Sequence, residues 1–157
     1  MKAKSGFTLV EILIVVVILG ILAAIVIPQF TSASVDAKES ALVSDLQSMR
    51  SQIELYKIHH NDELPGDPAN SSSGVDFETA MTSKTDQDGV VGSGATFRFG
   101  PYMQKLPENP FNNLSTVEIN GVAGNNSDGW NFVIATGLFQ PDDDKLNPVD
   151  DTPHTDY

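Results

Sequence analysis

An uninterrupted apolar stretch near the start of the chain constrains the fold more than any other feature of the sequence. Residues 7–27 contain a single charged side chain, Glu11, among aliphatic and small residues. An α-helix of this length spans about 30 Å, which matches the hydrocarbon core of a bilayer. The stretch is therefore predicted to cross a membrane, while the remainder of the chain folds outside the bilayer.

The charges that flank this stretch predict its orientation. Lys2 and Lys4 precede it, and by the positive-inside rule they stay in the cytoplasm while the residues after Ile27 lie in the periplasm or outside the cell. A cleaved secretory signal is one alternative, although the apolar run exceeds the usual h-region of about 7–15 residues. A plain single-pass anchor is another, but it leaves Glu11 unexplained, because an unpaired carboxylate is costly in hydrocarbon.

The acidic composition and the absence of cysteine exclude several functions for the rest of the chain. The 157 residues carry 21 acidic and 9 basic side chains, for a formal net charge of -12. Such an acidic head is a poor partner for nucleic acid, since phosphate binding needs clustered lysine and arginine. The chain has no cysteine, so it has no disulfide and no thiol chemistry.

The residues that open the apolar stretch form a specific motif. Gly6-Phe7-Thr8-Leu9-Val10-Glu11 follows a short basic leader and resembles the processing site of type IV pilins and type II secretion pseudopilins. The resemblance implies that a prepilin peptidase cuts between Gly6 and Phe7 and methylates the new N-terminus at Phe7. It also implies that Glu11 of one subunit pairs with the Phe7 amine of its neighbour during assembly. Physically, two buried opposite charges offset much of each other's desolvation cost when they pair.

Helical periodicity continues beyond the membrane segment. Pro28 lacks an N–H and is expected to kink or locally break the helix between the filament-core half, residues 7–29, and an amphipathic half, residues 30–60. The amphipathic half carries an apolar stripe with helical spacing. Its members are Val35, Leu42, Leu46, Met49, Ile53 and Tyr56. This stripe is expected to pack against the remainder of the domain.

The C-terminal half predicts a small sheet. Residues 61–115 are expected to be mostly loop, with a short helix at 77–81 and a proline-stiffened connector at 102–111 that resembles the one in major pseudopilins. Three short strands within residues 116–140 are expected to form an antiparallel meander that covers the helix. Residues 141–157 read as an acidic tail without a packing signal. The predicted fold class is α+β, with a long N-terminal helix packed on a small C-terminal sheet.

The polar residues of the head include candidates for metal binding. Hard cations such as calcium bind clustered oxygen ligands, and major pseudopilins bind calcium in loops near their final strands. The candidate calcium ligands are Asp142, Asp143, Asp144 and Asp150. No nucleophile motif surrounds any serine, so the sequence does not predict an enzyme. Three short glycosylation sequons begin at Asn70, Asn113 and Asn125, and they indicate exposed loops.

Together these features predict a structural subunit of a helical filament. Its expected partners are other copies of the chain, a prepilin peptidase, an inner-membrane assembly platform and minor pseudopilins or pilins, with the membrane holding it before assembly. The pseudopilus of a type II secretion system is favoured. A surface type IV pilin for adhesion, motility or DNA uptake is an alternative, and a membrane-anchored periplasmic enzyme or binding module is an alternative of a different class.

Overall fold

The structure is a computed structural model that describes residues 6–67 and 75–157. It divides into two compact units, Met1–Ala37 and Lys38–Tyr157, which are described separately below. Most of the predicted leader and the sequon at Asn70 lie outside the described residues.

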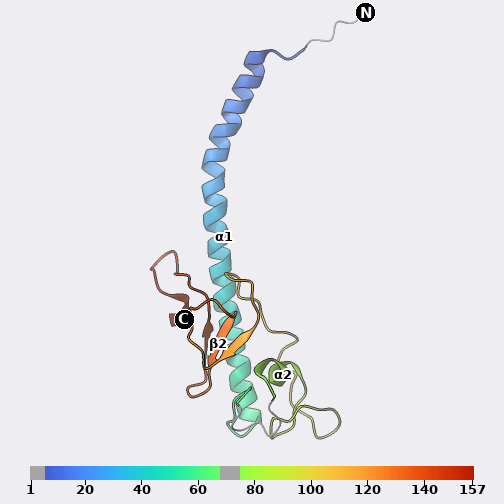
Figure 1. The fold of residues 1–157 in the computed structure, drawn as a ribbon. Coiled ribbons are helices and arrows are strands. Elements are labelled where there is room, and N and C mark those ends of the chain that lie inside the picture. Colours follow the sequence, from blue (N-terminus) through green and yellow to red (C-terminus); the bar gives the residue numbers. More distant parts are fainter. Residues whose placement is uncertain (1–5, 68–74) are drawn as a thin grey trace, which may run out of the picture. The chain divides into compact units, whose positions relative to one another are not determined.

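The N-terminal unit is formed by the first part of helix α1, which runs from Leu9 to His59 (Figure 1). The helix continues through Pro28, so the local break predicted there is absent from the described residues. The hydroxyl groups of Thr31 and Ser32 donate to the carbonyls of Ile27 and Pro28, at 3.1 and 3.3 Å. Pro28 has no N–H to donate within the helix. The two side-chain hydrogen bonds give the carbonyls of this turn additional donors.

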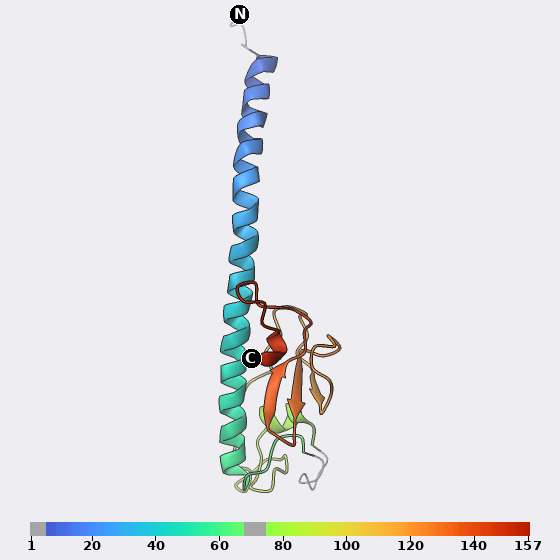
Figure 2. The same ribbon diagram turned by 90° about the vertical axis from the view of Figure 1, so that its left-hand side faces the viewer.

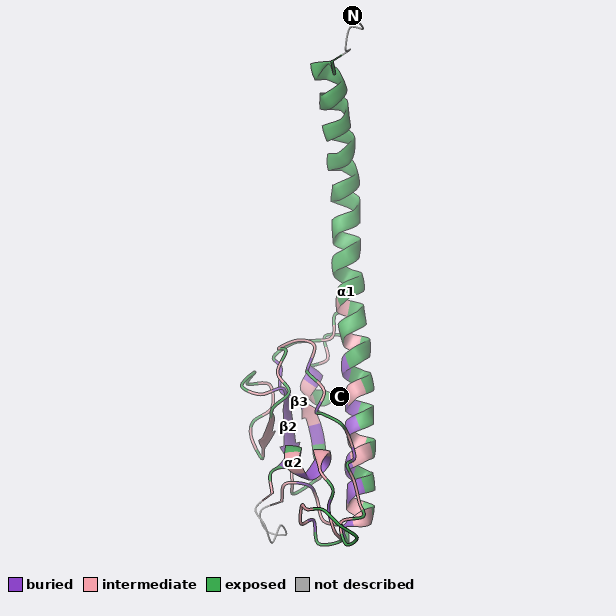
Figure 3. Ribbon diagram, turned by 90° about the vertical axis from the view of Figure 1, so that its right-hand side faces the viewer, coloured by how far each residue is buried: buried purple, intermediate pink, exposed green. Residues whose placement is uncertain are grey.

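The second part of α1 buries one face in the C-terminal unit. Its buried residues recur at steps of four and three, as predicted. They are Leu42, Leu46, Met49, Ile53 and Tyr56. Val35, the first predicted member of the stripe, belongs to the N-terminal unit and is only half-buried. Figure 3 shows this buried stripe on the side of the helix that faces the sheet. The helix ends where Asn61 and Asp62 adopt positive φ angles of 54° and 67°.

The sheet of the C-terminal unit is mixed rather than antiparallel. It contains β1 (Val117–Ile119), β2 (Trp130–Val133) and β3 (Leu138–Pro141), in that order. β2 and β3 pair antiparallel as predicted, but β1 pairs parallel to β2, so this part of the predicted meander is wrong. The α+β fold class itself is confirmed.

The parallel pairing arises from the connection between β1 and β2. An antiparallel pairing of these strands would need a tight hairpin turn at Asn120-Gly121, which would reverse the chain at once. Instead, Asn120 has a φ of 56°, its N–H donates to the carbonyl of Phe132, and its side-chain oxygen accepts from the N–H of Ile134. Residues 121–129 then return along the sheet, so that β2 starts beside the beginning of β1.

The hydrophobic core lies between the sheet and α1. Trp130, Phe132 and Phe139 have no exposed surface, and α2 (Phe77–Thr82) adds the ring of Phe77, 5.0 Å from that of Phe132. The indole N–H of Trp130 donates to the carbonyl of Pro107 at 2.9 Å, which fixes the predicted connector to the sheet. The core therefore joins the helix, the connector and all three strands, since Val117 and Ile119 pack against it as well.

The histidines at the end of α1 have a structural role. The ring of His60 is fully buried, stacks on Tyr56 at 3.8 Å, and contacts the hydroxyl of Thr85 at 2.9 Å. Burial lowers the pKa of His60, because the interior disfavours the charged imidazolium. His60 thus acts as a neutral, hydrogen-bonded core residue.

The C-terminal residues pack on the domain, contrary to the expectation of an unpacked acidic tail. Pro141, Asp142 and Asp143 are buried, and the short 3-10 helix η1 (His154–Asp156) begins with the buried His154. Figure 2 shows this segment returning to α1 beside the sheet. The packing of these residues was not predicted from the sequence, because the buried groups are mostly polar and hydrophobic periodicity detects only apolar positions.

Candidate functional site

The start of α1 is capped by its own side chains. Thr8 occupies the N-cap, and its main-chain N–H and its hydroxyl donate to Oε2 of Glu11, at 2.7 and 2.8 Å. The N–H of Glu11 donates in turn to the Thr8 hydroxyl at 3.2 Å. This reciprocal arrangement is a capping box. Both hydrogen bonds that Glu11 accepts end on Oε2, and this capping within the chain was not predicted from the sequence.

The surface of the first part of α1 is apolar and uncovered. Its large hydrophobic side chains have exposed fractions between 42% at Val26 and 83% at Leu9, and Phe7, which precedes the helix, is 85% exposed. The helix is long and apolar enough to cross a membrane. A surface of this size is unfavourable in water, so it needs either lipid or other protein surfaces as its environment.

The structure does not bring the four predicted calcium ligands together. Asp143 contacts the ring of His154, and Asp144 forms an exposed salt bridge with Lys145 at 2.6 Å. Asp150 accepts a hydrogen bond from the N–H of Thr152 within its own loop. Each of these carboxylates has a local partner, and the predicted set does not form a coordination shell.

Asp142 instead organises the connection that leads into β2. Its side chain is fully buried, and its two oxygens accept hydrogen bonds from the main-chain N–H groups of Asn125, Ser127 and Asp128, at 3.0–3.2 Å. Carboxylates that accept several main-chain N–H groups hold a loop firmly, because each of these bonds is charge-assisted. The return connection is therefore anchored on a residue that directly follows β3.

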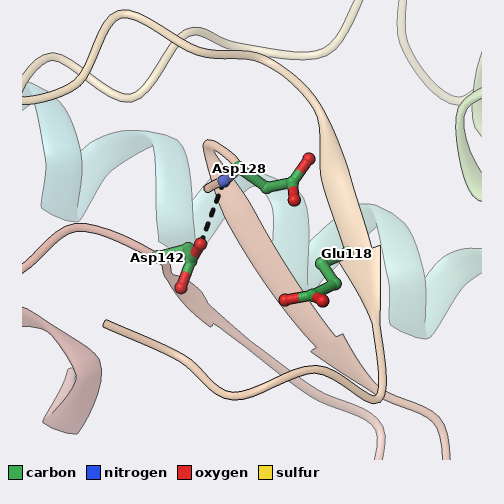
Figure 4. Close-up of side chains that lie close together, drawn as sticks. All are labelled: Glu118, Asp128 and Asp142. Carbon is green, nitrogen blue, oxygen red and sulfur yellow. Dashed lines mark hydrogen bonds between the residues drawn. The ribbon is translucent and has the colours of Figure 1, made fainter. Parts of the chain in front are cut away.

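Asp142 also belongs to a carboxylate cluster that the sequence did not predict. One oxygen each of Glu118, Asp128 and Asp142 lies within 4.8 Å of the others, and Figure 4 shows the three side chains converging. Glu118 lies on β1, Asp128 precedes β2 and Asp142 follows β3. No sequence pattern links them, because the parallel pairing of β1 brings Glu118 to this side of the sheet.

A buried amide lies next to this cluster in the sheet. Asn131 is opposite Glu118 in the β1–β2 register, so the two side chains share a face. Asn131 is 1% exposed, and neither its oxygen nor its nitrogen has a hydrogen-bond partner among the described residues. A buried amide without partners is costly, which marks it as a further potential oxygen ligand.

Comparison of the amino-acid sequence with known proteins shows the family of this chain. Residues 1–27 match the prokaryotic N-terminal methylation motif. The type II secretion system core protein G of Pseudomonas aeruginosa is 33% identical over 114 residues, covering 71% of each chain. The chain belongs to the type II secretion system core protein G family. The members from Vibrio cholerae (30% identity, 72% of this chain and 69% of that one) and Aeromonas hydrophila (28% identity, 83% and 95%) agree.

Membership in the core protein G family confirms the resemblance inferred from the first residues. The matched methylation motif includes Gly6, Phe7 and Glu11 and extends to Ile27. The relative from Aeromonas hydrophila aligns over nearly its full length, so the likeness extends into the C-terminal unit. No solved structure matches the chain significantly.

Proposed function

We propose that the chain is a structural subunit of a type II secretion pseudopilus, processed by a prepilin peptidase and polymerised through the first part of α1. The observation that carries this proposal is the uncovered apolar surface of that helix, which has one carboxylate near its start and the methylation motif around it. Lipid covers this surface in the precursor, and neighbouring helices cover it in the filament. Family membership supports the same function.

Glu11 gives the assembly its register. Cleavage between Gly6 and Phe7 creates an amine four residues before Glu11. In lipid, the capping box satisfies part of the carboxylate's hydrogen-bonding capacity within its own chain. In the filament, the carboxylate pairs with the Phe7 amine of a neighbour, and a subunit docked out of step leaves both charges unpaired.

The partners and location follow from this role. The precursor is a single-pass protein of the inner membrane with its C-terminal unit in the periplasm, and the assembled subunit lies in a periplasmic pseudopilus. An assembly platform in the inner membrane and minor pseudopilins complete the set of partners. The subunit acts as a building block and not as an enzyme. A surface pilin remains the second candidate, because it would share the same motif and helix.

Processing is tested by the intact mass of the protein extracted from membranes. In cells that contain the prepilin peptidase, we expect a product that lacks residues 1–6 and carries one added methyl group on Phe7. Cells without the peptidase serve as the control and should yield the full precursor. An intact leader and an unmethylated N-terminus in both strains would contradict the proposal.

We further propose that the C-terminal unit binds calcium at Glu118, Asp128 and Asp142. Ligands on opposite sides of a calcium ion lie up to about 5 Å apart, since each Ca–O distance is about 2.3–2.6 Å. The spacing of the three carboxylates fits this range, and the unpartnered Asn131 offers a fourth oxygen. Among the described residues, none of the three forms a salt bridge that would neutralise it.

Calcium is therefore expected to stabilise the C-terminal unit. Trp130 is the chain's one tryptophan and is fully buried, so its fluorescence reports unfolding of this unit alone. At a calcium concentration a hundredfold above the dissociation constant, the free energy of unfolding should rise by about 2.7 kcal/mol, and a chelator should reverse the gain. Glu118→Gln should abolish the effect, whereas Glu108→Gln, at an exposed position, should retain it. Equal stability with calcium and with chelator would refute the site.

A further inference from the structure

Gly121 leaves free the space that the side chain of Glu118 occupies. Gly121 lies two residues after the end of β1, where the return connection to β2 begins. A Cβ atom at this position would overlap Oε2 and Cδ of Glu118. The three heavy atoms nearest to such a Cβ atom all belong to the Glu118 side chain. The carboxylate of Glu118 therefore lies directly against the backbone of Gly121.

The φ angle of Gly121 does not account for the glycine. Gly124, in the same connection, has a φ of 82°, which favours glycine, whereas Gly121 lies outside the positive-φ region. The φ angle at position 121 is therefore open to residues that carry a Cβ atom. What requires glycine there is the close approach of the Glu118 side chain.

The backbone around Gly121 is anchored on both sides. On one side, the main-chain N–H and the side-chain oxygen of Asn120 form hydrogen bonds of 2.9 and 3.0 Å to main-chain groups at the end of β2. On the other side, the N–H of Asn125 donates to Oδ1 of Asp142 at 3.2 Å. These bonds restrain the backbone, whereas the Glu118 side chain can rotate to another rotamer. If position 121 carried a Cβ atom, the Glu118 side chain would be the group that moves.

We propose that Gly121 is a positioning residue for calcium binding. The inference rests on the calcium site proposed above, in which Glu118 converges with Asp128 and Asp142 (Figure 4). Gly121 offers no side-chain ligand, but it lets the Glu118 carboxylate lie beside the other two. A long hydrogen bond of 3.4 Å from the side-chain amide of Asn125 to Oε2 supports the same position of the carboxylate. A side chain at position 121 turns Glu118 away and leaves the ion with fewer ligands.

Titration of the full-length protein in detergent with calcium chloride, followed by calorimetry, tests this role. Residues that orient metal ligands typically contribute about 10–100-fold to affinity, so Gly121→Ala should weaken calcium binding by about that factor. Val122→Ala, at the next and exposed position, is the matched control and should bind calcium as the unmodified chain does. Unchanged affinity in Gly121→Ala would overturn the positioning role and leave the calcium site standing. Absence of binding by the unmodified chain would overturn the site and the role together.

Stability without calcium provides a second measurement. In chelator, the denaturant midpoint of Gly121→Ala, followed by the fluorescence of Trp130, should be no lower than that of the unmodified chain. The reasons are that only a flexible side chain has to move and that alanine lowers the entropy of the unfolded chain. Gly129→Ala is the contrasting control, because its Cβ atom would overlap the backbone carbonyl of Leu114, so its midpoint should fall. A lower midpoint for Gly121→Ala in chelator would overturn the proposal, because it would show that the backbone and not the carboxylate is displaced.

Discussion

Replacing Glu11 is expected to abolish filament assembly while the precursor still accumulates in the membrane. Both Glu11→Ala and Glu11→Gln remove the charge that would pair with the Phe7 amine of a neighbouring subunit. An amine left unpaired in a buried helix bundle costs several kcal/mol, so filament yield should fall by about a hundredfold or more. The measurement is filament density by electron microscopy, with precursor level followed by immunoblot.

The capping box separates two roles of the carboxylate. Glutamine at the third helical position preserves a capping box, whereas alanine removes it, so Glu11→Gln tests the charge alone. Thr8→Val is the reciprocal variant, since it keeps the charge and removes the side-chain hydroxyl of the box. Its expected cost is small, about 1 kcal/mol of helix stability. Normal filaments from Glu11→Gln would show that capping, and not charge pairing, is what assembly requires.

Replacing Asp142 is expected to destabilise the C-terminal unit more than replacing any other acidic residue near β3. Asp142→Ala would leave the main-chain N–H groups of Asn125, Ser127 and Asp128 without their acceptor. Each charge-assisted hydrogen bond of this kind is worth about 1.5–3 kcal/mol, so a loss of at least about 3 kcal/mol is expected. Denaturant unfolding followed by the fluorescence of Trp130 measures it.

A neighbouring residue provides the matched control for Asp142. Asp144 is exposed and pairs only with the exposed Lys145, so Asp144→Asn should change the free energy of unfolding by less than about 1 kcal/mol. The comparison is made in chelator, so that loss of a bound cation does not contribute. If the two variants have the same stability, the hydrogen bonds to the return connection are not a major source of stability.

The N-terminal half of the chain was largely predictable because its signals are local. Hydrophobic length, flanking lysines and the spacing of Gly6, Phe7 and Glu11 all lie within one short window of sequence. The stripe from Leu42 to Tyr56 was equally readable, because helical periodicity depends only on neighbours along the chain. The capping box of Thr8 and Glu11 was not predicted, although it is also local and has a recognisable sequence form.

The C-terminal half was less predictable because its polar contacts join distant residues. The direction of β1 depends on a connection that Asp142 holds from the far side of β2. Likewise, Glu39 and His154 become partners only once residues 143–157 have returned to α1. Acidic residues usually indicate solvated surface, so Asp142 and Asp143 gave no sign in the sequence that they are buried.

The anchoring of the return connection also sets an order of events during biosynthesis. The residues that lead into β2 are held by a carboxylate that follows β3, and the parallel strand β1 depends on that same connection. A chain that is synthesised from its N-terminus therefore exposes α1, β1 and β2 before their anchor arrives. Completion of the sheet waits for residue 142, so the subunit folds late and as a unit rather than strand by strand.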